Sequence, residues 1–223
     1  TSLPGGPVLL AQAGGMRGTQ VTVAGLLMGL LMGPAGAGAV QVAAAYQPQV
    51  GDIVFHTSTS AQSLAVQQAT RSPLSHMGLV LIQGGQPVVL EAVQPVKYTP
   101  LAQWQARGEG GHYVVKRLKA PLPDDAGARL EREAGRYLGK PYDLTFEWSD
   151  KRIYCSELVW KLYRDALGIE LAPLARLDSF DLSHPAVRAK LKERYGARVP
   201  LAEPVIAPSA LFAAPLLEAV AEE

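Results

Sequence analysis

The sequence is poor in the residues from which disulfides and metal sites are built. It has one cysteine and four histidines, and the histidines lie far apart in the chain. A single cysteine cannot form an internal disulfide, and a structural zinc site needs several Cys or His ligands at short spacing. The sequence also has no His-x-x-x-His pair of a zinc hydrolase, no Gly-x-Ser-x-Gly elbow of a serine hydrolase and no phosphate-binding glycine loop. We therefore expect neither a metal site nor a cofactor.

The chain also has almost no net charge. Its 21 Lys and Arg residues are balanced by 20 Asp and Glu residues, and the basic residues are scattered. This gives no support to nucleic acid or an anionic membrane surface as the main partner. Hydrophobic residues make up 48% of the chain and charged residues 18%, which is enough for a packed core. The length of 223 residues indicates one domain with appendages.

The amino-terminal region has the order of features found in a signal peptide. Met16 and Arg17 precede an almost wholly apolar run, Val21–Met32, and small residues follow up to Ala39. A basic start, a short apolar stretch and small residues before the cut define such signals. We expect cleavage after Ala39 or Ala45, and hence an exported protein that is periplasmic or secreted.

This assignment divides the chain into a segment outside the fold and one domain. Residues 1–15 precede the expected start, so residues 1–45 are interpreted as an upstream extension and signal peptide, and residues 46–223 as the folded domain. An uncleaved membrane anchor is the alternative, although the apolar run is short for a membrane span and contains glycines. Peripheral association with the cell envelope is compatible with export. The residues do not predict an oligomeric state.

Hydrophobic periodicity predicts strands and helices in separate blocks, which is typical of the α+β class. The expected strands cover residues 50–55, 77–82, 87–93 and 112–118. The expected helices cover residues 60–69, with Ser60 as N-cap and Leu64 facing inward, and residues 124–138, 156–167, 185–195 and 209–220. The sequence predicts no element across residues 94–111.

Cys155 stands at the start of the strongest helical pattern in the chain. The first backbone N–H groups of a helix are unpaired, and the helix dipole favours an anion there. A cysteine at this position has a lowered pKa and more of the thiolate, which is the form that attacks. The other interpretation is a small buried hydrophobe, and position alone does not decide between the two. In an oxidising compartment a lone thiol needs a reason to be present, and catalysis is one.

A hairpin places a histidine and a carboxylate on one face of the sheet. A turn centred between Gly84 and Gly85 pairs residues whose numbers sum to 169, so Gly78 lies opposite Glu91. Because side chains alternate along a strand, His76, Gly78 and Glu91 share a face. His76 and Glu91 are then diagonal neighbours, about 7 Å apart at the backbone, and Gly78 leaves room between them. A bulge in the hairpin would reverse the parity.

This pair could orient and activate a nucleophile. The carboxylate can hold one ring nitrogen and leave the other for a thiol. Taken alone, His76 could be a strand-end histidine bound by solvent, and Glu91 a carboxylate on a wet sheet face. Their coincidence on one face favours a functional pair. Of the other histidines, His56 could lie near the site, whereas His112 has no visible carboxylate partner and His184 is expected at the surface.

Five short segments occur in an order that is specific as a set. They are Gly51-Asp52-Ile53-Val54-Phe55, Ser75-His76-Met77-Gly78-Leu79-Val80, Glu91-Ala92, Gly139-Lys140-Pro141-Tyr142-Asp143 and Tyr154-Cys155-Ser156-Glu157-Leu158-Val159. From about residue 48 to the carboxyl end, the chain resembles the YiiX/YebB-like family, within the circularly permuted papain-like branch of the NlpC-type hydrolases. In that family the histidine precedes the cysteine in the chain, as His76 precedes Cys155.

The resemblance implies a permuted papain-like α+β fold, in which an antiparallel sheet or small barrel packs on a helix that bears the catalytic cysteine. It implies Cys155 as nucleophile, His76 as base, Glu91 as the orienting residue and Tyr154 as a residue that shapes the oxyanion site. The expected activity is hydrolysis of an amide or ester bond in a small-molecule, peptide or lipid substrate, through an acyl-enzyme. A lipid-directed acyltransferase on the same residues and a binding module without turnover are the alternatives.

Overall fold

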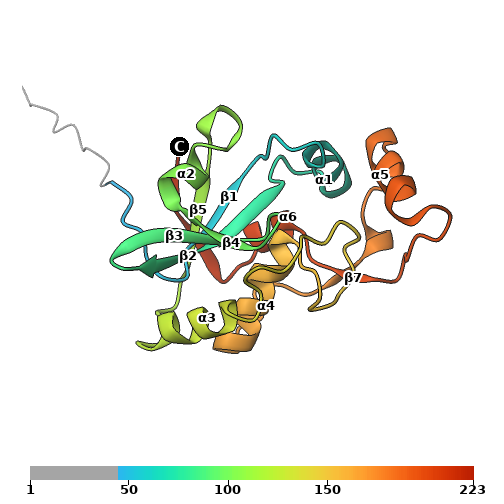
Figure 1. Ribbon diagram of the computed structural model, residues 1–223. Coiled ribbons are helices and arrows are strands. Elements are labelled where there is room, and N and C mark those ends of the chain that lie inside the picture. Colours follow the sequence, from blue (N-terminus) through green and yellow to red (C-terminus); the bar gives the residue numbers. More distant parts are fainter. Residues whose placement is uncertain (1–44) are drawn as a thin grey trace, which may run out of the picture. The chain divides into compact units, whose positions relative to one another are not determined.

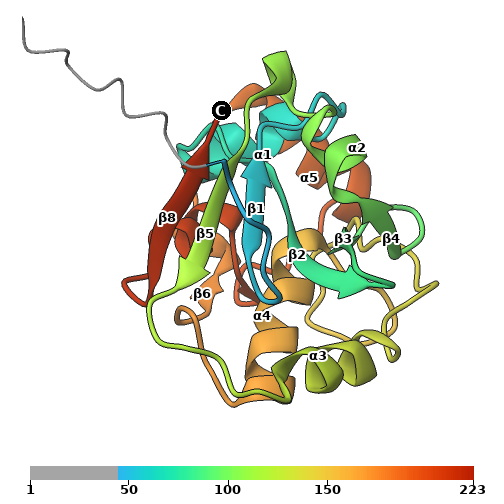
Figure 2. The same cartoon turned by 90° about the vertical axis from the view of Figure 1, so that its left-hand side faces the viewer.

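A six-stranded antiparallel sheet forms the centre of the computed structural model, which describes residues 45–223. The strand order is β4-β3-β2-β1-β5-β8, with β4 and β8 at the two edges (Figure 2). The strands are β1 Ile53–His56, β2 His76–Gln83, β3 Gln86–Glu91, β4 Lys97–Pro100, β5 Val114–Leu118 and β8 Leu217–Glu222. A separate two-stranded ribbon joins β6 Ala175–Arg176 to β7 Pro204–Val205.

Helices cover the sheet and extend beyond it. They are α1 Ser63–Thr70, α2 Leu101–Gln105, α3 Ala126–Ala134, α4 Cys155–Leu167, α5 Pro185–Tyr195 and α6 Pro208–Phe212, with the 3-10 turns η1 Glu109–Gly111 and η2 Leu177–Ser179. Helices α3 and α4 pack on each other and on β2, whereas α2 packs on β3 and β4. Helix α1 packs on α5, away from the sheet centre (Figure 1).

The alternation of side chains along the strands gives the domain two hydrophobic cores. On one face of β2, Met77, Leu79 and Leu81 are fully buried together with residues of α3 and α4. On the other face, Val80 packs in a smaller core that includes Trp104 of α2. Both faces of the central strands are therefore covered, which explains why β2 reads as a continuous apolar run rather than as an alternating one.

Helix α4 lies at the centre of the larger core and begins at Cys155. It ends at Leu167, and Gly168 follows as the C-cap, with the positive φ (72°) that glycine favours at this position. The hydroxyl of Tyr163 donates a hydrogen bond to the carbonyl of Gly51, which ties the helix to the segment before β1. The prediction of an α+β fold, with an antiparallel sheet packed on the helix that bears the cysteine, is confirmed.

The structure differs from the predicted elements in three places. Helix α1 begins at Ser63 rather than near Ser60, its N-cap position is Gln62, and Leu64 is 52% exposed, so the predicted N-cap and inward position are wrong. The helix expected over residues 209–220 ends as α6 at Phe212. Residues 217–222 instead form β8, because the backbone of this segment pairs with β5. Strand β4 and helix α2 lie where no element was predicted.

The predicted signal peptide lies almost wholly outside the described residues. Among residues 45–223, no helix is long and apolar enough to cross a membrane.

Candidate active site

Cys155 occupies the first position of α4 and is almost fully buried, with 4% exposure. The preceding residue, Tyr154, has an extended backbone and is the N-cap. The amide of Cys155 therefore has no intrahelical acceptor, as is general for the first turn of a helix. The backbone N–H groups of Met77 and Ser156 donate to the sulfur. The thiol is thus surrounded by donors that favour its anionic form.

The ring of His76 lies between the thiol and Glu91. Its Nε2 lies 2.7 Å from Oε2 of Glu91, which leaves Nδ1 for the sulfur of Cys155. Burial opposes protonation of the ring, but the bonds to Cys155 and Glu91 outweigh it and raise the pKa of His76 to about 9. Burial likewise disfavours the thiolate, yet His76 and the backbone donors lower the pKa of Cys155. These opposite shifts favour a thiolate-imidazolium pair at neutral pH.

Glu91 is fully buried and binds two further residues besides His76. Thr99 of β4 donates to its Oε1 at 2.6 Å, and Nη2 of Arg107 donates to Oε1 at 2.5 Å and to Oε2 at 2.6 Å. Burial disfavours the carboxylate, but His76, Thr99 and Arg107 together lower the pKa of Glu91 to about 2. The carboxylate therefore stays ionised and fixed at neutral pH, which also fixes the ring of His76.

The hairpin has the register that the sequence predicts. Pairs from Leu79–Leu90 to Gln83–Gln86 all sum to 169, with no register shift in the hairpin. A Cβ atom built on Gly78 would lie 3.4 Å from Cβ of Glu91 and 2.3 Å from Cγ1 of Val89. Glycine is thus required at this position for the strand to pass the carboxylate that holds His76.

A second histidine, His56, lies beside His76. His56 pairs with His76 across β1 and β2, and its ring stacks on Trp104 with centroids 4.1 Å apart. Burial, and then the positive charges of His76 and Arg107, lower the pKa of His56 to about 3. His56 is therefore neutral and packs beside the base. His112 and His184 lie elsewhere, bound to the Glu223 carbonyl and to the Ala186 amide.

Two tyrosines lie near the cysteine with different hydrogen bonds. The phenol oxygen of Tyr154 accepts a hydrogen bond from the amide of Ile206 at 3.1 Å, and the ring is buried in the larger core. The role predicted for Tyr154 in shaping the oxyanion site stays a prediction. The hydroxyl of Tyr142, in contrast, bonds to the thiol of Cys155. Burial and the negative charge of the thiolate raise the pKa of Tyr142 well above its usual range, so it remains a donor.

A chain of hydrogen bonds fixes the direction in which Tyr142 donates. Nη2 of Arg194 donates to Oε1 of Gln62 at 2.7 Å, and Nε2 of Gln62 donates to the hydroxyl of Tyr142 at 3.2 Å. Because arginine can only donate, the amide of Gln62 must turn its NH2 group toward Tyr142. The tyrosine oxygen accepts that bond, and its own proton is left for the sulfur or for an oxyanion beside it.

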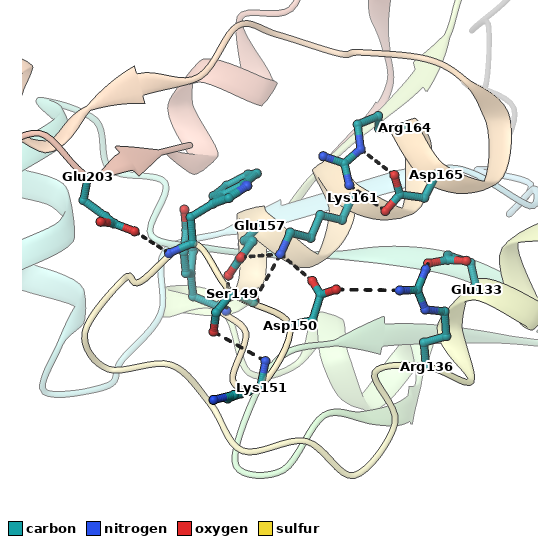
Figure 3. A network of polar contacts seen from close by, with 12 residues as sticks. Glu133, Arg136, Ser149, Asp150, Lys151, Glu157, Lys161, Arg164, Asp165 and Glu203 are labelled. Carbon is teal, nitrogen blue, oxygen red and sulfur yellow. Dashed lines mark hydrogen bonds and ion pairs between the residues drawn. The ribbon is translucent and has the colours of Figure 1, made fainter.

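The loop that follows Tyr142 is fastened to α4 by a buried lysine (Figure 3). Nζ of Lys161 donates to the carbonyl of Ser149 at 3.0 Å and to Oδ1 of Asp150 at 2.7 Å, and lies 2.8 Å from Oε1 of Glu157. The two ends of the loop meet where Tyr142 pairs with Ile153. The contacts of Lys161 fasten the loop between Tyr142 and Ile153 to α4. They therefore help to hold Tyr142 beside the start of that helix.

Comparison with known proteins gives the family of the chain. Residues 47–221 match the model of a family described as "Permuted papain-like amidase enzyme, YaeF/YiiX, C92 family". The chain belongs to this family. Its members are described as amidases of papain type, so the chain is a papain-like hydrolase by family.

Two relatives from Escherichia coli are similar over most of their length. "Uncharacterized protein YiiX" of strain K12 is 54% identical over 179 residues, which are 80% of this chain and 89% of the relative. The crystal structure of YiiX from E. coli O157:H7 matches with a TM-score of 0.77 and 54% identity, over 80% of this chain and 99% of that one. The permuted papain-like fold is thus established independently of the residue motifs.

The E. coli O157:H7 protein is described as a metalloprotein. Residues 45–223 of the present chain contain no group of three or more His, Cys, Asp or Glu side chains arranged to hold a metal ion. Both carboxylate oxygens of Glu91 are already bound by protein donors, and Nε2 of His76 is bound to Glu91. The donor set around Cys155 therefore does not fit a metal.

Sequence reasoning missed the residues that support the predicted triad. Thr99 and Arg107 lie in the region where no element was predicted, and Arg194 lies on α5, far along the chain. Tyr142 stood in a recognised motif, but nothing in the sequence showed that its hydroxyl would reach the thiol. The sequence signals for these residues are weak: Tyr142 lies in a short motif, Arg107 and Arg194 are two of many scattered basic residues, and Thr99 has no distinguishing neighbours.

Proposed function

We propose that the protein is an exported thiol hydrolase that cleaves an amide or ester bond through an acyl-enzyme on Cys155. The observation that carries this proposal is the line of contacts from Glu91 through His76 to the thiol at the start of α4. Nucleophilic sites of this type need a nucleophile, a base and a third group that orients the base. The family, described as amidases, supports the same reaction class.

The first half of the reaction forms the acyl-enzyme. The Cys155 thiolate attacks the carbonyl carbon, and negative charge develops on the carbonyl oxygen. The amide of Cys155 and the hydroxyl of Tyr142 are the donors available for that oxygen. His76, protonated as its raised pKa requires, then gives its proton to the leaving nitrogen or oxygen. The carbon-heteroatom bond breaks, and the acyl group remains on the sulfur.

The second half releases the acid. His76, now neutral, takes a proton from water as the water attacks the thioester carbonyl. The carbon-sulfur bond breaks, and the carboxylic acid leaves while Cys155 returns as thiolate beside protonated His76. Glu91 keeps Nε2 of the ring in place through both halves, so Nδ1 exchanges the proton throughout.

The assignment of Cys155 and His76 is tested by turnover of an activated ester and the matching anilide. We expect Cys155→Ala and His76→Ala to lower kcat/KM by a factor of about 10³ or more, as loss of the nucleophile or base does in comparable sites. Arg176→Ala, which changes an exposed ion pair, is the matched control and should retain the activity. Full activity of the Cys155→Ala protein would refute the proposal.

Export is proposed from the amino-terminal sequence. The basic start, the apolar run Val21–Met32 and the small residues up to Ala39 support it. Amino-terminal sequencing of the mature protein tests this part: a new terminus after Ala39 or Ala45 supports export by cleavage. Retention of the apolar run in a membrane fraction would favour the anchored alternative.

A further inference from the structure

A groove on the His76 side of the candidate active site has a polar lining. This groove, here called the polar groove, has a volume of about 750 Å³, and its lining includes His76, Arg107, Gln94 and Ser58. Its lining residues all lie in the described part of the chain, and none of them is Asp or Glu. The charged side chains of the lining are therefore cationic, because Arg107 is always protonated and the raised pKa of His76 keeps its ring protonated at neutral pH.

The place of His76 decides which part of a substrate lies in the polar groove. His76 lines this groove, whereas Cys155 lines a second hollow and not the groove. Tyr142 lines both, so a carbonyl held between Cys155 and Tyr142 lies where the two hollows meet. The leaving group must come within reach of the acid that protonates it, which is His76. The leaving group therefore lies in the polar groove.

Arg107 lies beside the base and keeps two of its nitrogens free. Its Nη2 donates to Oε2 of Glu91 at 2.6 Å, and Nε2 of His76 lies 2.7 Å from the same oxygen. Nε and Nη1 of Arg107 have no acceptor among residues 45–223, and the side chain is 43% exposed. Glu91 itself is fully buried and does not line the groove. The guanidinium thus holds Glu91 with one nitrogen and leaves the other two for a ligand in the groove.

Two further side chains of the groove offer donors, because their acceptor atoms are already bound. Oε1 of Gln94 accepts a hydrogen bond from the amide of Tyr142 at 2.7 Å, so the NH2 group of Gln94 is left as a donor. Oγ of Ser58 accepts from the backbone amide two residues further on at 3.1 Å, which leaves its own proton free. Ser58 also pairs with the residue that follows Arg107, so it lies close to that arginine. Together these groups favour a ligand rich in acceptors.

We propose that the leaving group of the substrate carries an oxyanion, either a carboxylate or a phosphate, that binds in the polar groove to Arg107, Gln94 and Ser58. This inference rests on the proposed acyl-enzyme at Cys155. Carboxylates and phosphates offer several acceptor oxygens, and their hydrogen bonds to a guanidinium are about twice as strong as those between neutral groups. The bond to Glu91 also fixes the guanidinium in advance, so less side-chain entropy is lost when the anion binds.

A cationic or neutral leaving group fits these residues less well. A cation would meet Arg107 and the protonated ring of His76, and the lining of the groove has no carboxylate to offset the repulsion. A neutral amide would bring an N–H donor into the groove, where Arg107, Gln94 and Ser58 offer it donors. An oxyanion accepts from all three.

The test is hydrolysis of four phenyl acetates that share the acyl part and differ in the group at position 3 of the leaving phenol: carboxylate, phosphate, carboxamide and trimethylammonium. Each kcat/KM is divided by the rate constant for hydrolysis by hydroxide, which corrects for the reactivity of the ester, and the rate of Cys155→Ala is subtracted as the blank. For the full chain we expect the carboxylate or the phosphate ester to be preferred at least tenfold over the carboxamide ester, because a hydrogen bond to a charged group is worth about that factor. The preferred anion identifies the class of leaving group. Equal corrected rates, or a preference for the trimethylammonium ester, overturn the inference.

A pair of glutamate variants locates the effect. Gln94→Glu keeps an acceptor for the amide of Tyr142 but replaces the free NH2 group by a negative oxygen, and should lower the carboxylate-to-carboxamide ratio about fivefold or more. Gln86→Glu makes the same change at the exposed first residue of β3, outside the groove, and should leave the ratio unchanged. An equal loss in both variants would overturn the assignment of the groove.

Arg107→Gln separates anion binding from support of Glu91. It should lower all four rates, because Glu91 loses a partner, and should also bring the carboxylate-to-carboxamide ratio close to one. Four rates that fall by the same factor, with the ratio kept, would show that Arg107 serves Glu91 alone and would overturn the inference. If Arg107→Gln does not fold, the ratio of the unmodified chain and the Gln94 pair decide.

The outcome also separates this inference from the function on which it rests. If the four esters acylate Cys155 at equal corrected rates, the acyl-enzyme stands and the oxyanion site fails. If no ester forms an adduct on Cys155, both fail.

Discussion

Replacement of Glu91 by glutamine tests how the base is oriented, with almost no change of shape. The carboxylate now accepts hydrogen bonds from His76, Thr99 and Arg107, all of which are donors. Glutamine has one acceptor oxygen, and its NH2 group must face one of these donors. If the NH2 group faces His76, the ring must accept at Nε2 and carries its proton on Nδ1, where it cannot take a proton from the thiol.

The size of the effect follows from the pKa of His76. Its rise from 6.5 to about 9 corresponds to about 3 kcal/mol in favour of the imidazolium. Loss of the Glu91 charge removes part of this stabilisation, and the wrong tautomer lowers the rate further, toward the factor of about 10⁴ known for an Asp→Asn change in a serine protease triad. We expect Glu91→Gln to lower kcat/KM by a factor of about 10² to 10⁴.

The assay is steady-state hydrolysis of a short p-nitrophenyl ester, with circular dichroism to show that the variant is folded. Thr99→Val is the matched control, because it removes one hydrogen bond to Glu91 and leaves the charge in place. It should lower kcat/KM by less than tenfold. A folded Glu91→Gln protein with less than a fivefold loss would refute the orienting role of the carboxylate.

Three further results are expected. Alkylation of the thiol by iodoacetamide should already be fast at pH 6.5, and His76→Ala should slow it more than tenfold there, because the thiol pKa returns toward about 8.5. Lys161→Met should lower the free energy of unfolding by about 3 kcal/mol, because it leaves the Glu157 carboxylate buried without its cation. Gly78→Ala should cost about 1–3 kcal/mol in urea unfolding, because the new methyl overlaps Val89.

Each of these predictions has a control or a result that would contradict it. For the alkylation profile, identical pH dependence in the wild type and the His76 variant would show that the ring does not stabilise the thiolate. For Lys161→Met, the exposed pair of Arg176 and Asp178 supplies a variant, Arg176→Met, that should change stability by less than about 0.5 kcal/mol. The Lys161 effect should also be larger at pH 8 than at pH 6, because burial raises the pKa of Glu157 to about 7. For Gly78→Ala, an unchanged free energy of unfolding would show that β2 has room for a methyl group at this position, which would contradict the close approach of Val89.

The sequence was most informative where local rules act alone. Hairpin parity placed His76 and Glu91 on one face because a two-residue turn leaves the register no freedom, and the structure has that register. The helical stripe after Cys155 likewise predicted α4 to within one residue. These inferences needed only the period of a strand, the period of a helix and the geometry of a tight turn.

The sequence was least informative where distant segments meet. Residues 217–222 have a composition that suits a helix, and only pairing with β5 makes them a strand. Arg107 and Thr99 reach Glu91 because β4 and α2 fold back beside β3, which no local pattern indicates. The same holds for Arg194, which is brought to Gln62 by the packing of α5 on α1.

Mass spectrometry of the trapped acyl-enzyme shows whether Cys155 is the nucleophile. The full chain is mixed briefly with p-nitrophenyl acetate, quenched in acid and digested, and the peptide that contains Cys155 is sequenced by fragmentation. We expect one acetyl group on the sulfur of Cys155, which decays as the acid is released, and no adduct in Cys155→Ala. Turnover of the ester with the acetyl group on another residue, or with no adduct on Cys155 at any quench time, would refute this assignment.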